Sequence, residues 1–157
     1  MSSESLPEQK VILASNSSIR KKILEDSGIS FEVVPSEVEE EELKQSLSSN
    51  NFKEYCLALA KAKALDVSNK KKNAYVIGSD QICCYGEEIF SKPLTKENCF
   101  KTLSKLSGNT HYQNCGISIC KNGKEIWSHY AQAALTMKSL SDREIRDYID
   151  KDEPFMA

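Results

Sequence analysis

The sequence lacks the features that mark membrane, secreted and duplex-binding proteins. It contains no run of about 18 apolar residues, the length that a membrane-spanning helix needs. Its start is polar and includes Glu4 and Glu8, whereas a secretory signal begins basic and continues apolar. The formal net charge is −2, so the surplus of cations that binds duplex nucleic acid is missing. We therefore expect a cytoplasmic protein that contacts neither a membrane nor duplex nucleic acid.

The sequence also lacks a glycine-rich phosphate loop and the closely spaced cysteine pairs of a zinc site. The chain has 6 glycines, and they do not form the G-x-x-x-x-G-K-[ST] phosphate loop. None of its 6 cysteines belongs to a C-x-x-C pair, and it has 2 histidines, so the spacing gives a zinc site no support. We expect the cysteines to be buried free thiols, and a thiol or zinc protein is the weaker alternative.

Strand and helix patterns alternate within 157 residues, a length typical of one domain. Apolar runs and turn signals predict strands at Val11–Ala14, Phe31–Val34, Tyr75–Gly78, Gly116–Cys120 and Lys124–Met137, with a hairpin over Ile82–Phe90. Caps and helical spacing predict helices from Ser18 to Gly28, from Asn50 or Asn51 to about Val67, from Thr95 to Leu106 and from Ser141 to about Asp150. This mixture predicts an α/β or α+β fold with a mixed sheet.

The first candidate site is the polar turn Ser15–Ser18 and the helix that comes after it. A strand leads into this turn, and the free backbone N–H groups at the start of a helix favour anions such as phosphate. Three consecutive cations, Arg20–Lys22, oppose the helix dipole there, and a bound anion would relieve that conflict. A serine cap flanked by solvated cations explains the same residues without a ligand.

The second candidate is Lys63. The long helix carries an apolar stripe that comprises Phe52, Tyr55, Cys56, Leu59 and Ala60. Lys63 takes the next position on that stripe, whereas Lys61 falls on the opposite face. Its side chain either extends past the end of the core to water or holds a phosphate with its ammonium.

Two carboxylates and a second lysine complete the candidates. Asp80 comes directly after an apolar strand, where open α/β sheets bind ligands, so it can hold a divalent cation or accept a proton from water. An aspartate in an ordinary turn is the alternative. Glu40 lies in the acidic run Glu37–Glu42, which is otherwise a solvated segment, and is a candidate second carboxylate. Lys92, in a rigid turn before a proline, is either solvated or a phosphate clamp.

Taken in order, these segments resemble the Maf family, the septum-formation-inhibitor-like nucleotide pyrophosphatases. The matching segments are Leu13–Arg20, Val38–Glu40, Leu59–Ala64, Ile77–Gln81, Lys92–Pro93, Leu106–His111 and Asp152–Pro154. No single segment is decisive, but the ordered set is specific. The resemblance runs from Val11 to Ala157.

The resemblance implies an elongated mixed sheet flanked by helices, with a nucleotide cleft between two lobes of a single domain, 1–157. It implies hydrolysis of a nucleoside triphosphate to the monophosphate and pyrophosphate with a divalent cation, Mg²⁺ or Mn²⁺. Asp80 then activates water or binds the metal, with Glu40 as the second acidic group at the metal. The implied phosphate contacts are Ser15, Ser17, Arg20, Lys63 and Lys92.

The pair Asp80-Gln81 is similar to the branch that prefers 7-methyl-GTP, whereas the branch acting on dTTP and UTP has Asp-Thr. Ile19 and Gln81 are then specificity positions. Ser18 stands where the family usually has proline. Family members continue past the position of Ala157, so we expect this chain to lack the family's C-terminal segment. A catalytically impaired nucleotide-binding or interaction module is therefore the alternative function, and a homodimer is left open.

Overall fold

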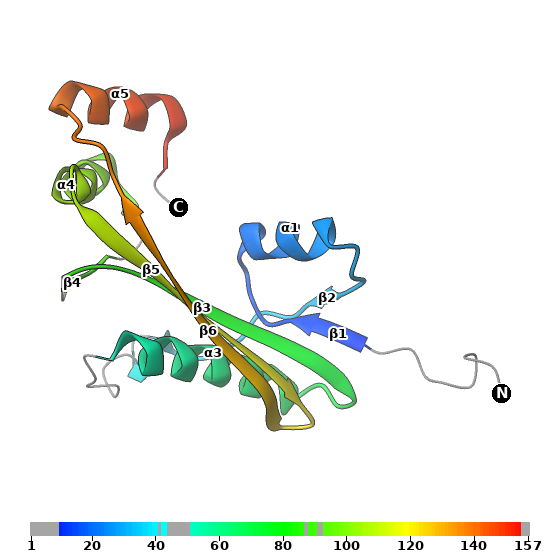
Figure 1. The fold of residues 1–157 in the computed structure, drawn as a ribbon. Helices are drawn as coiled ribbons and strands as arrows, with labels where there is room; N and C mark the ends of the chain where they lie inside the picture. Colours follow the sequence, from blue (N-terminus) through cyan, green and yellow to red (C-terminus); the bar gives the residue numbers. More distant parts are fainter. Residues whose placement is uncertain (1–9, 41, 44–50, 87, 91–92, 155–157) are drawn as a thin grey trace. The chain divides into compact units, whose positions relative to one another are not determined.

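The computed structural model describes residues 10–40, 42–43, 51–86, 88–90 and 93–154. The elements are β1 (Lys10–Leu13), α1 (Ser18–Asp26), β2 (Glu32–Val33), α3 (Phe52–Ser68), β3 (Ala74–Tyr85), β4 (Glu88–Phe90), α4 (Lys96–Leu106), β5 (Thr110–Lys121), β6 (Lys124–Thr136) and α5 (Asp142–Asp152) (Figure 1). The α/β prediction is confirmed. In these ranges, no helix is long and apolar enough to cross a membrane.

The strands of the described residues form one six-stranded mixed sheet in the order β2-β1-β3-β5-β6, with β4 beside β3. β1 runs parallel to both of its neighbours, and Ile12 lies opposite Glu32 on one side and Val76 on the other. β4 runs antiparallel to β3. The turn between β5 and β6 is the predicted one, because Asn122 and Gly123 both have the positive φ that a tight hairpin turn requires.

The chain divides into two compact units. Unit 1 comprises the chain up to Asp80 together with Cys115–Ala131, and unit 2 comprises Gln81–Asn114 together with the chain from Gln132. The long strands β3, β5 and β6 contribute residues to both. The nucleotide cleft between two lobes and the single-domain organisation stay predictions.

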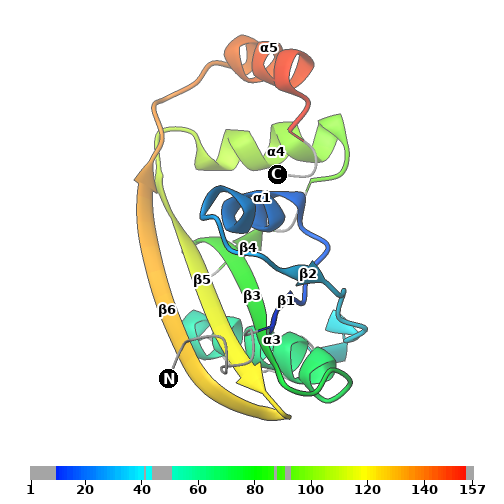
Figure 2. The ribbon, with the colours of Figure 1, turned by 90° about the vertical axis from the view of Figure 1, so that its right-hand side faces the viewer.

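Unit 1 is built by packing α3 against the strands. Figures 1 and 2 show α1 and α3 on opposite sides of β1. The side chain of Asn51 accepts hydrogen bonds from the backbone N–H groups of Lys53 and Glu54, so it caps α3 as predicted. α3 and β3 approach so closely that a Cβ on Gly78 would lie 2.4 Å from the carbonyl oxygen of Ala60. Only glycine, which has no Cβ, fits there. The buried cluster here comprises Ile12, Ala14, Ala64, Val67, Ala74, Val76 and Cys120.

Unit 2 contains α4 and α5, which pack on each other through Cys99, Ile145 and Ile149. Thr95 caps α4 with its side chain, which accepts a hydrogen bond from the backbone N–H of Asn98. Ser141 and Glu144 form the predicted capping box at the start of α5. The helix starts that were predicted from capping residues are thus confirmed.

Two strand boundaries were predicted wrongly. β3 continues from Ala74 to Tyr85 without a break, so Asp80 lies inside a strand and not in a turn beyond its end. β5 begins at Thr110, six residues before the predicted start at Gly116. In both cases polar residues suggested a loop, whereas pairing with neighbouring strands keeps the backbone extended.

Candidate active site

Lys63 lies at the centre of a group of oxygen atoms. Its side chain is 10% exposed, and its Nζ lies 2.7 Å from Oε1 of Glu40 and 3.3 Å from Oδ1 of Asp80. The same ammonium donates to the backbone carbonyl of Ser79 at 3.4 Å. The largely buried side chain therefore ends between two carboxylates and does not extend to water, although it continues the apolar stripe of α3.

The close contact of α3 with β3 explains how Asp80 reaches Lys63. Side chains two residues apart in a strand point to the same face. Asp80 is two residues beyond Gly78, where the backbone of β3 touches that of Ala60 on α3. The carboxylate of Asp80 therefore points toward α3 and meets the side chain of Lys63, one turn along the helix from Ala60.

The pKa of the Asp80 carboxyl lies above its usual value. Burial raises the pKa of Asp80, and the nearby ammonium of Lys63 opposes this rise. Glu40 adds to the rise, whereas Arg20 works against it. One oxygen, Oδ2, is buried without a hydrogen-bond partner among the residues that the structure describes. Asp80 thus offers a lone pair that can accept a proton or bind a cation.

The polar turn before α1 has the predicted capping geometry. Ser17 caps the helix, and its hydroxyl accepts a hydrogen bond from the backbone N–H of Arg20 at 3.3 Å. The hydroxyl of Ser15, which is 9% exposed, accepts from the backbone N–H of Ser17 at 3.0 Å and from Nη1 of Arg20 at 3.5 Å. The turn therefore holds two hydroxyls and a guanidinium together at a helix N-terminus, as an anion site requires.

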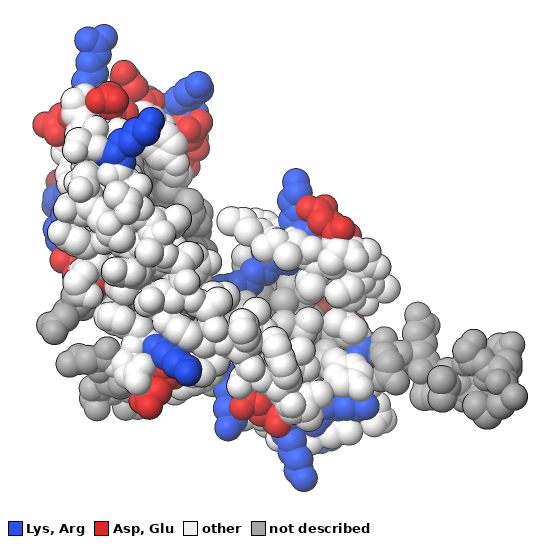
Figure 3. All heavy atoms as spheres, viewed as in Figure 1, with Lys and Arg blue, Asp and Glu red and all other residues white. Residues whose placement is uncertain are grey.

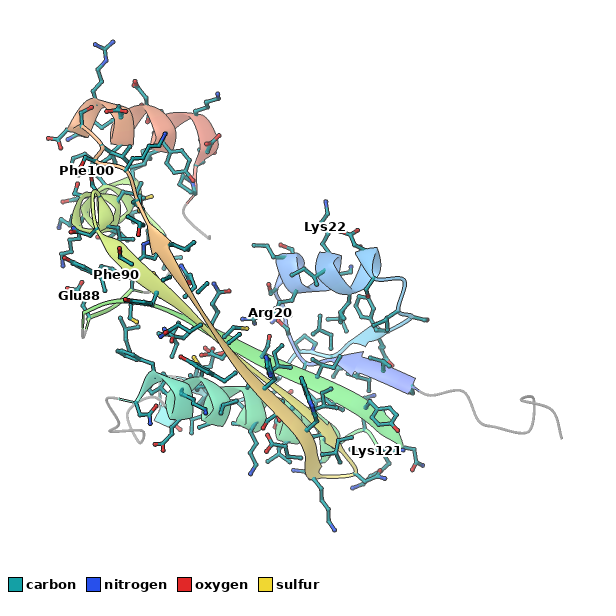
Figure 4. All side chains as sticks on the ribbon, in the orientation of Figure 1. Arg20, Lys22, Glu88, Phe90, Phe100 and Lys121 are labelled. Atoms are coloured by element: carbon teal, nitrogen blue, oxygen red, sulfur yellow. The ribbon has the colours of Figure 1, made fainter. Side chains whose placement is uncertain are left out.

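The side chains of the three consecutive cations of α1 point in different directions. Figure 4 shows Arg20 pointing from the start of α1 toward the sheet and Lys22 pointing away from it. Lys21 lies 3.9 Å from Glu25 on the surface of the same helix. Arg20 is close enough to Asp80 to oppose the rise of its pKa. Of the three, Arg20 is the one placed to serve the site.

The other two candidates that the structure describes, Ile19 and Gln81, are exposed. Ile19 is 63% exposed on α1. Gln81 belongs to unit 2, lies next to Asp80 on the other face of β3, and donates to the side chain of Gln113 at 2.8 Å. Lys92 lies outside the described residues. Six of the candidates lie near one another in unit 1, namely Ser15 and Ser17 in the turn before α1, Arg20 on α1, Glu40 before α3, Lys63 on α3 and Asp80 on β3.

Comparison with known proteins identifies the family. Residues 10–157 match the family model described as Maf-like protein. The chain belongs to the Maf-like family. A nucleoside triphosphate pyrophosphatase of Legionella pneumophila (strain Corby) is 37% identical over 155 residues, which cover 99% of this chain and 78% of the relative.

Two further comparisons place this Maf-like chain among other proteins. A 7-methyl-GTP pyrophosphatase of Brucella abortus biovar 1 is 37% identical over 144 residues, covering 90% of this chain and 72% of the relative. The solved structure of a HAM1 protein from Coxiella burnetii has a TM-score of 0.49 and 12% identity, covering 81% of this chain and 71% of that one. The likeness to this structure is too low to bear on function.

Sequence patterns missed two neighbours of the site in this Maf-like chain. The carbonyl of Ser79 is a backbone acceptor, which no side-chain pattern reveals. Burial raises the pKa of the Cys115 thiol on β5, while Arg20 lowers it and Asp80 raises it, so the half-buried thiol lies within electrostatic reach of both. Only the pairing of distant strands brings Cys115 here, and the sequence carries no signal for that register.

The acidic residues fit a divalent cation that binds together with a phosphorylated ligand. Glu40 and Asp80 supply carboxylate oxygens, the ligands that Mg²⁺ prefers, and Asp80 has an unpartnered oxygen. Within the described ranges, no three His, Cys, Asp or Glu residues are grouped to hold a metal. Mg²⁺ commonly takes one or two carboxylates and completes its shell with phosphate oxygens and water. Two carboxylates are therefore sufficient for such a site, and insufficient for a closed zinc site.

Proposed function

We propose that this Maf-like chain hydrolyses a nucleoside triphosphate at its α-phosphate and releases the monophosphate and pyrophosphate. The observation that carries the proposal is the set Lys63, Asp80 and Glu40, in which two carboxylates lie within 3.3 Å of one buried ammonium. Burying charged groups costs desolvation free energy, and carboxylates with shifted pKa values cluster at catalytic sites. The names of relatives at 37% identity support the same activity and do not favour a non-catalytic module.

Asp80 is the group that activates water in this proposal. A base works best when its pKa is near the working pH, and burial raises the pKa of Asp80 in that direction. Lys63 and Arg20 oppose the rise, which favours the ionised carboxylate that can accept a proton. The unpartnered Oδ2 is the oxygen available to take it.

The cations and the turn before α1 hold the phosphates. Ser17 and the first backbone N–H groups of α1 present donors at a helix N-terminus, where phosphate is favoured. Arg20 and Lys63 offset the negative charge of the phosphate chain, which is the main requirement of phosphoryl transfer. Glu40 and Asp80 are the residues that would hold Mg²⁺ or Mn²⁺. When bound, this cation neutralises charge on the phosphate oxygens.

The finer specificity that we propose is for a 7-methyl-GTP-like nucleotide. It rests on the pair Asp80-Gln81 and on the named activity of the relative from Brucella abortus. Gln81 is exposed in unit 2, with its amide bonded to Gln113, so its donors and acceptors lie at the surface.

The test is turnover of a panel of 7-methyl-GTP, GTP, dTTP and UTP, with Mg²⁺ or Mn²⁺ and with a chelator, in water enriched in ¹⁸O. Attack at the α-phosphate puts the labelled oxygen on the nucleoside monophosphate and leaves pyrophosphate unlabelled. We expect that pattern, fastest with 7-methyl-GTP and only with metal. Release of orthophosphate, or label in the pyrophosphate, would overturn the mechanism. Faster turnover of dTTP or UTP would overturn only the specificity.

A further inference from the structure

All donors of the Lys63 ammonium are already occupied in the described structure. An ammonium has three N–H donors. Three acceptors surround it, namely Oε1 of Glu40 at 2.7 Å, Oδ1 of Asp80 at 3.3 Å and the carbonyl of Ser79 at 3.4 Å. A phosphate that contacts Lys63 therefore has to take the place of one of these oxygens.

Glu40 is the partner that can leave. Its side chain is 42% exposed, whereas that of Asp80 is 10% exposed. The carbonyl of Ser79 belongs to the backbone of β3 and is fixed by the strand. Water can solvate Glu40 when it leaves the ammonium, but a buried Asp80 without its cation would be left uncompensated. The shortest of the three contacts is thus also the one that costs least to exchange.

The charge balance of the site changes in that exchange. Lys63 and Arg20 carry two positive charges, and Asp80 and Glu40 carry two negative charges when ionised, so the group is balanced without a ligand. A phosphate chain that arrives alone adds negative charge beside a carboxylate that has just lost its cation. A divalent cation removes that repulsion, because it can bind the phosphate and the released carboxylate together.

We infer that Glu40 is the exchangeable counter-ion of Lys63: an incoming phosphate displaces it from the ammonium, and its released carboxylate makes phosphate binding depend on a divalent cation. This inference rests on the proposed pyrophosphatase site and adds a role for Glu40 before any chemistry. Glu40 keeps the ammonium occupied until phosphate and metal arrive together. Glu40 thus discriminates against metal-free phosphates.

The experiment measures the affinity of inorganic pyrophosphate by calorimetry, with EDTA and with Mg²⁺, for the wild type and three variants. Glu40→Gln removes the charge, and Glu40→Asp keeps the charge but shortens its reach to Lys63. Glu39→Gln is the matched control, because it removes a charge one residue away on an exposed side chain. Thermal unfolding of each variant shows that it is folded.

Without metal, we expect Glu40→Gln to bind pyrophosphate more tightly than the wild type, on the order of three- to tenfold, as for loss of one partly buried charge pair. Glu40→Asp should show part of that gain, because the contact is weakened although the net charge is unchanged. Glu39→Gln should bind like the wild type. Mg²⁺ should tighten binding by a larger factor in the wild type than in Glu40→Gln.

Two results would overturn the inference in different ways. If the wild type binds pyrophosphate but Glu40→Gln and Glu40→Asp do so equally well without metal, Glu40 is not displaced and the proposed function stands. If Glu40→Gln binds pyrophosphate more tightly than the wild type but Glu40→Asp does not, the tighter binding comes from the change of overall charge. That result would reject the displacement of Glu40 from Lys63. If no folded protein binds pyrophosphate with or without Mg²⁺, the phosphate site itself fails, and the proposed function fails with it.

Discussion

Both units of this chain carry exposed ion pairs, but among the described residues unit 1 also contains a buried one. In unit 1, Lys63 and Asp80 are both 10% exposed at their side chains and contact each other. In unit 2, Lys105 pairs with Glu88 and Lys96 with Asp150, and every one of these side chains is at least half exposed. Exposed pairs add little to stability, whereas a buried pair carries a desolvation cost that its attraction repays only with good geometry and further hydrogen bonds. The contrast supports the proposal that the chemistry takes place in unit 1.

The units also differ in what their helices rest on. α3 of unit 1 lies against β3 so closely that Gly78 has no room for a side chain. α4 and α5 of unit 2 instead rest mainly on each other through Cys99, Ile145 and Ile149. We therefore expect unit 1 to be sensitive to changes of buried charge, and unit 2 to changes of apolar volume.

The largest change of stability is expected for Lys63→Met. This substitution leaves Asp80 buried without its main counter-ion, which should cost about 3–5 kcal/mol of unfolding free energy near neutral pH. The matched control is Lys61→Met, an exposed lysine of the same helix, which should change stability by less than about 0.5 kcal/mol. Urea unfolding of both variants measures the difference. Equal losses of unfolding free energy in the two variants would show that the buried Lys63–Asp80 pair matters no more to stability than an exposed lysine.

The cost of Lys63→Met should depend on pH. The pKa of Asp80 is already raised in the folded protein, so the folded state binds this proton more tightly than the unfolded state, and stability falls as pH rises above the unfolded pKa. Lys63 opposes the rise and Glu40 supports it, so the variant raises the pKa of Asp80 further. The stability that Lys63→Met loses relative to the wild type should therefore become smaller as pH falls and Asp80 becomes protonated. A deficit that grows in acid would contradict this account.

A smaller and local effect is expected for Ile145→Ala in unit 2. Ile145 is 1% exposed between α4 and α5, so its truncation should leave a cavity and cost about 2–4 kcal/mol. Tyr148→Ala on the same helix is the control, because Tyr148 is 45% exposed. Hydrogen exchange should accelerate at the backbone amides of α4 and α5 in Ile145→Ala alone. Acceleration of the same size in Tyr148→Ala would show that the cluster does not hold the helices.

The smallest effect is expected for Lys105→Gln. Lys105 donates to Glu88 at 2.9 Å and lies 5.8 Å from the ring centroid of Phe90. Its side chain is 55% exposed, so solvent screens both interactions, and the loss should stay below about 1 kcal/mol. Figure 3 shows acidic and basic side chains interspersed on the face that it displays. A loss comparable to that of Lys63→Met would contradict the contrast between the units.

Much of the fold can be predicted from local signals in the sequence. The caps at Asn51, Thr95 and Ser141 and the turn at Asn122-Gly123 were predicted because a cap or tight turn depends on a few adjacent residues. The strand boundaries around Asp80 and Thr110 were predicted wrongly because they do not depend on adjacent residues. There the backbone conformation is decided by pairing with strands distant in the sequence, which local polarity cannot reveal.

The sequence singles out residues of the candidate site, but it does not predict the contacts between them. The stripe of α3 singled out Lys63, and the end of an apolar run singled out Asp80. The contact of Lys63 with Glu40 joins residues 23 positions apart through tertiary packing, and no periodicity predicts its 2.7 Å distance. The burial that raises the pKa of Asp80 likewise depends on the packed structure.

The central claim is that Asp80 activates water for attack on the α-phosphate, and the turnover of Asp80→Asn tests it most directly. The asparagine keeps the size of the side chain and removes the acceptor charge, so kcat for release of the nucleoside monophosphate should fall on the order of 10²-fold or more. Asp150→Asn makes the same change at a surface side chain that is 68% exposed, and it should keep kcat within about twofold of the wild type. A folded Asp80→Asn protein that turns over at the wild-type rate would contradict the account.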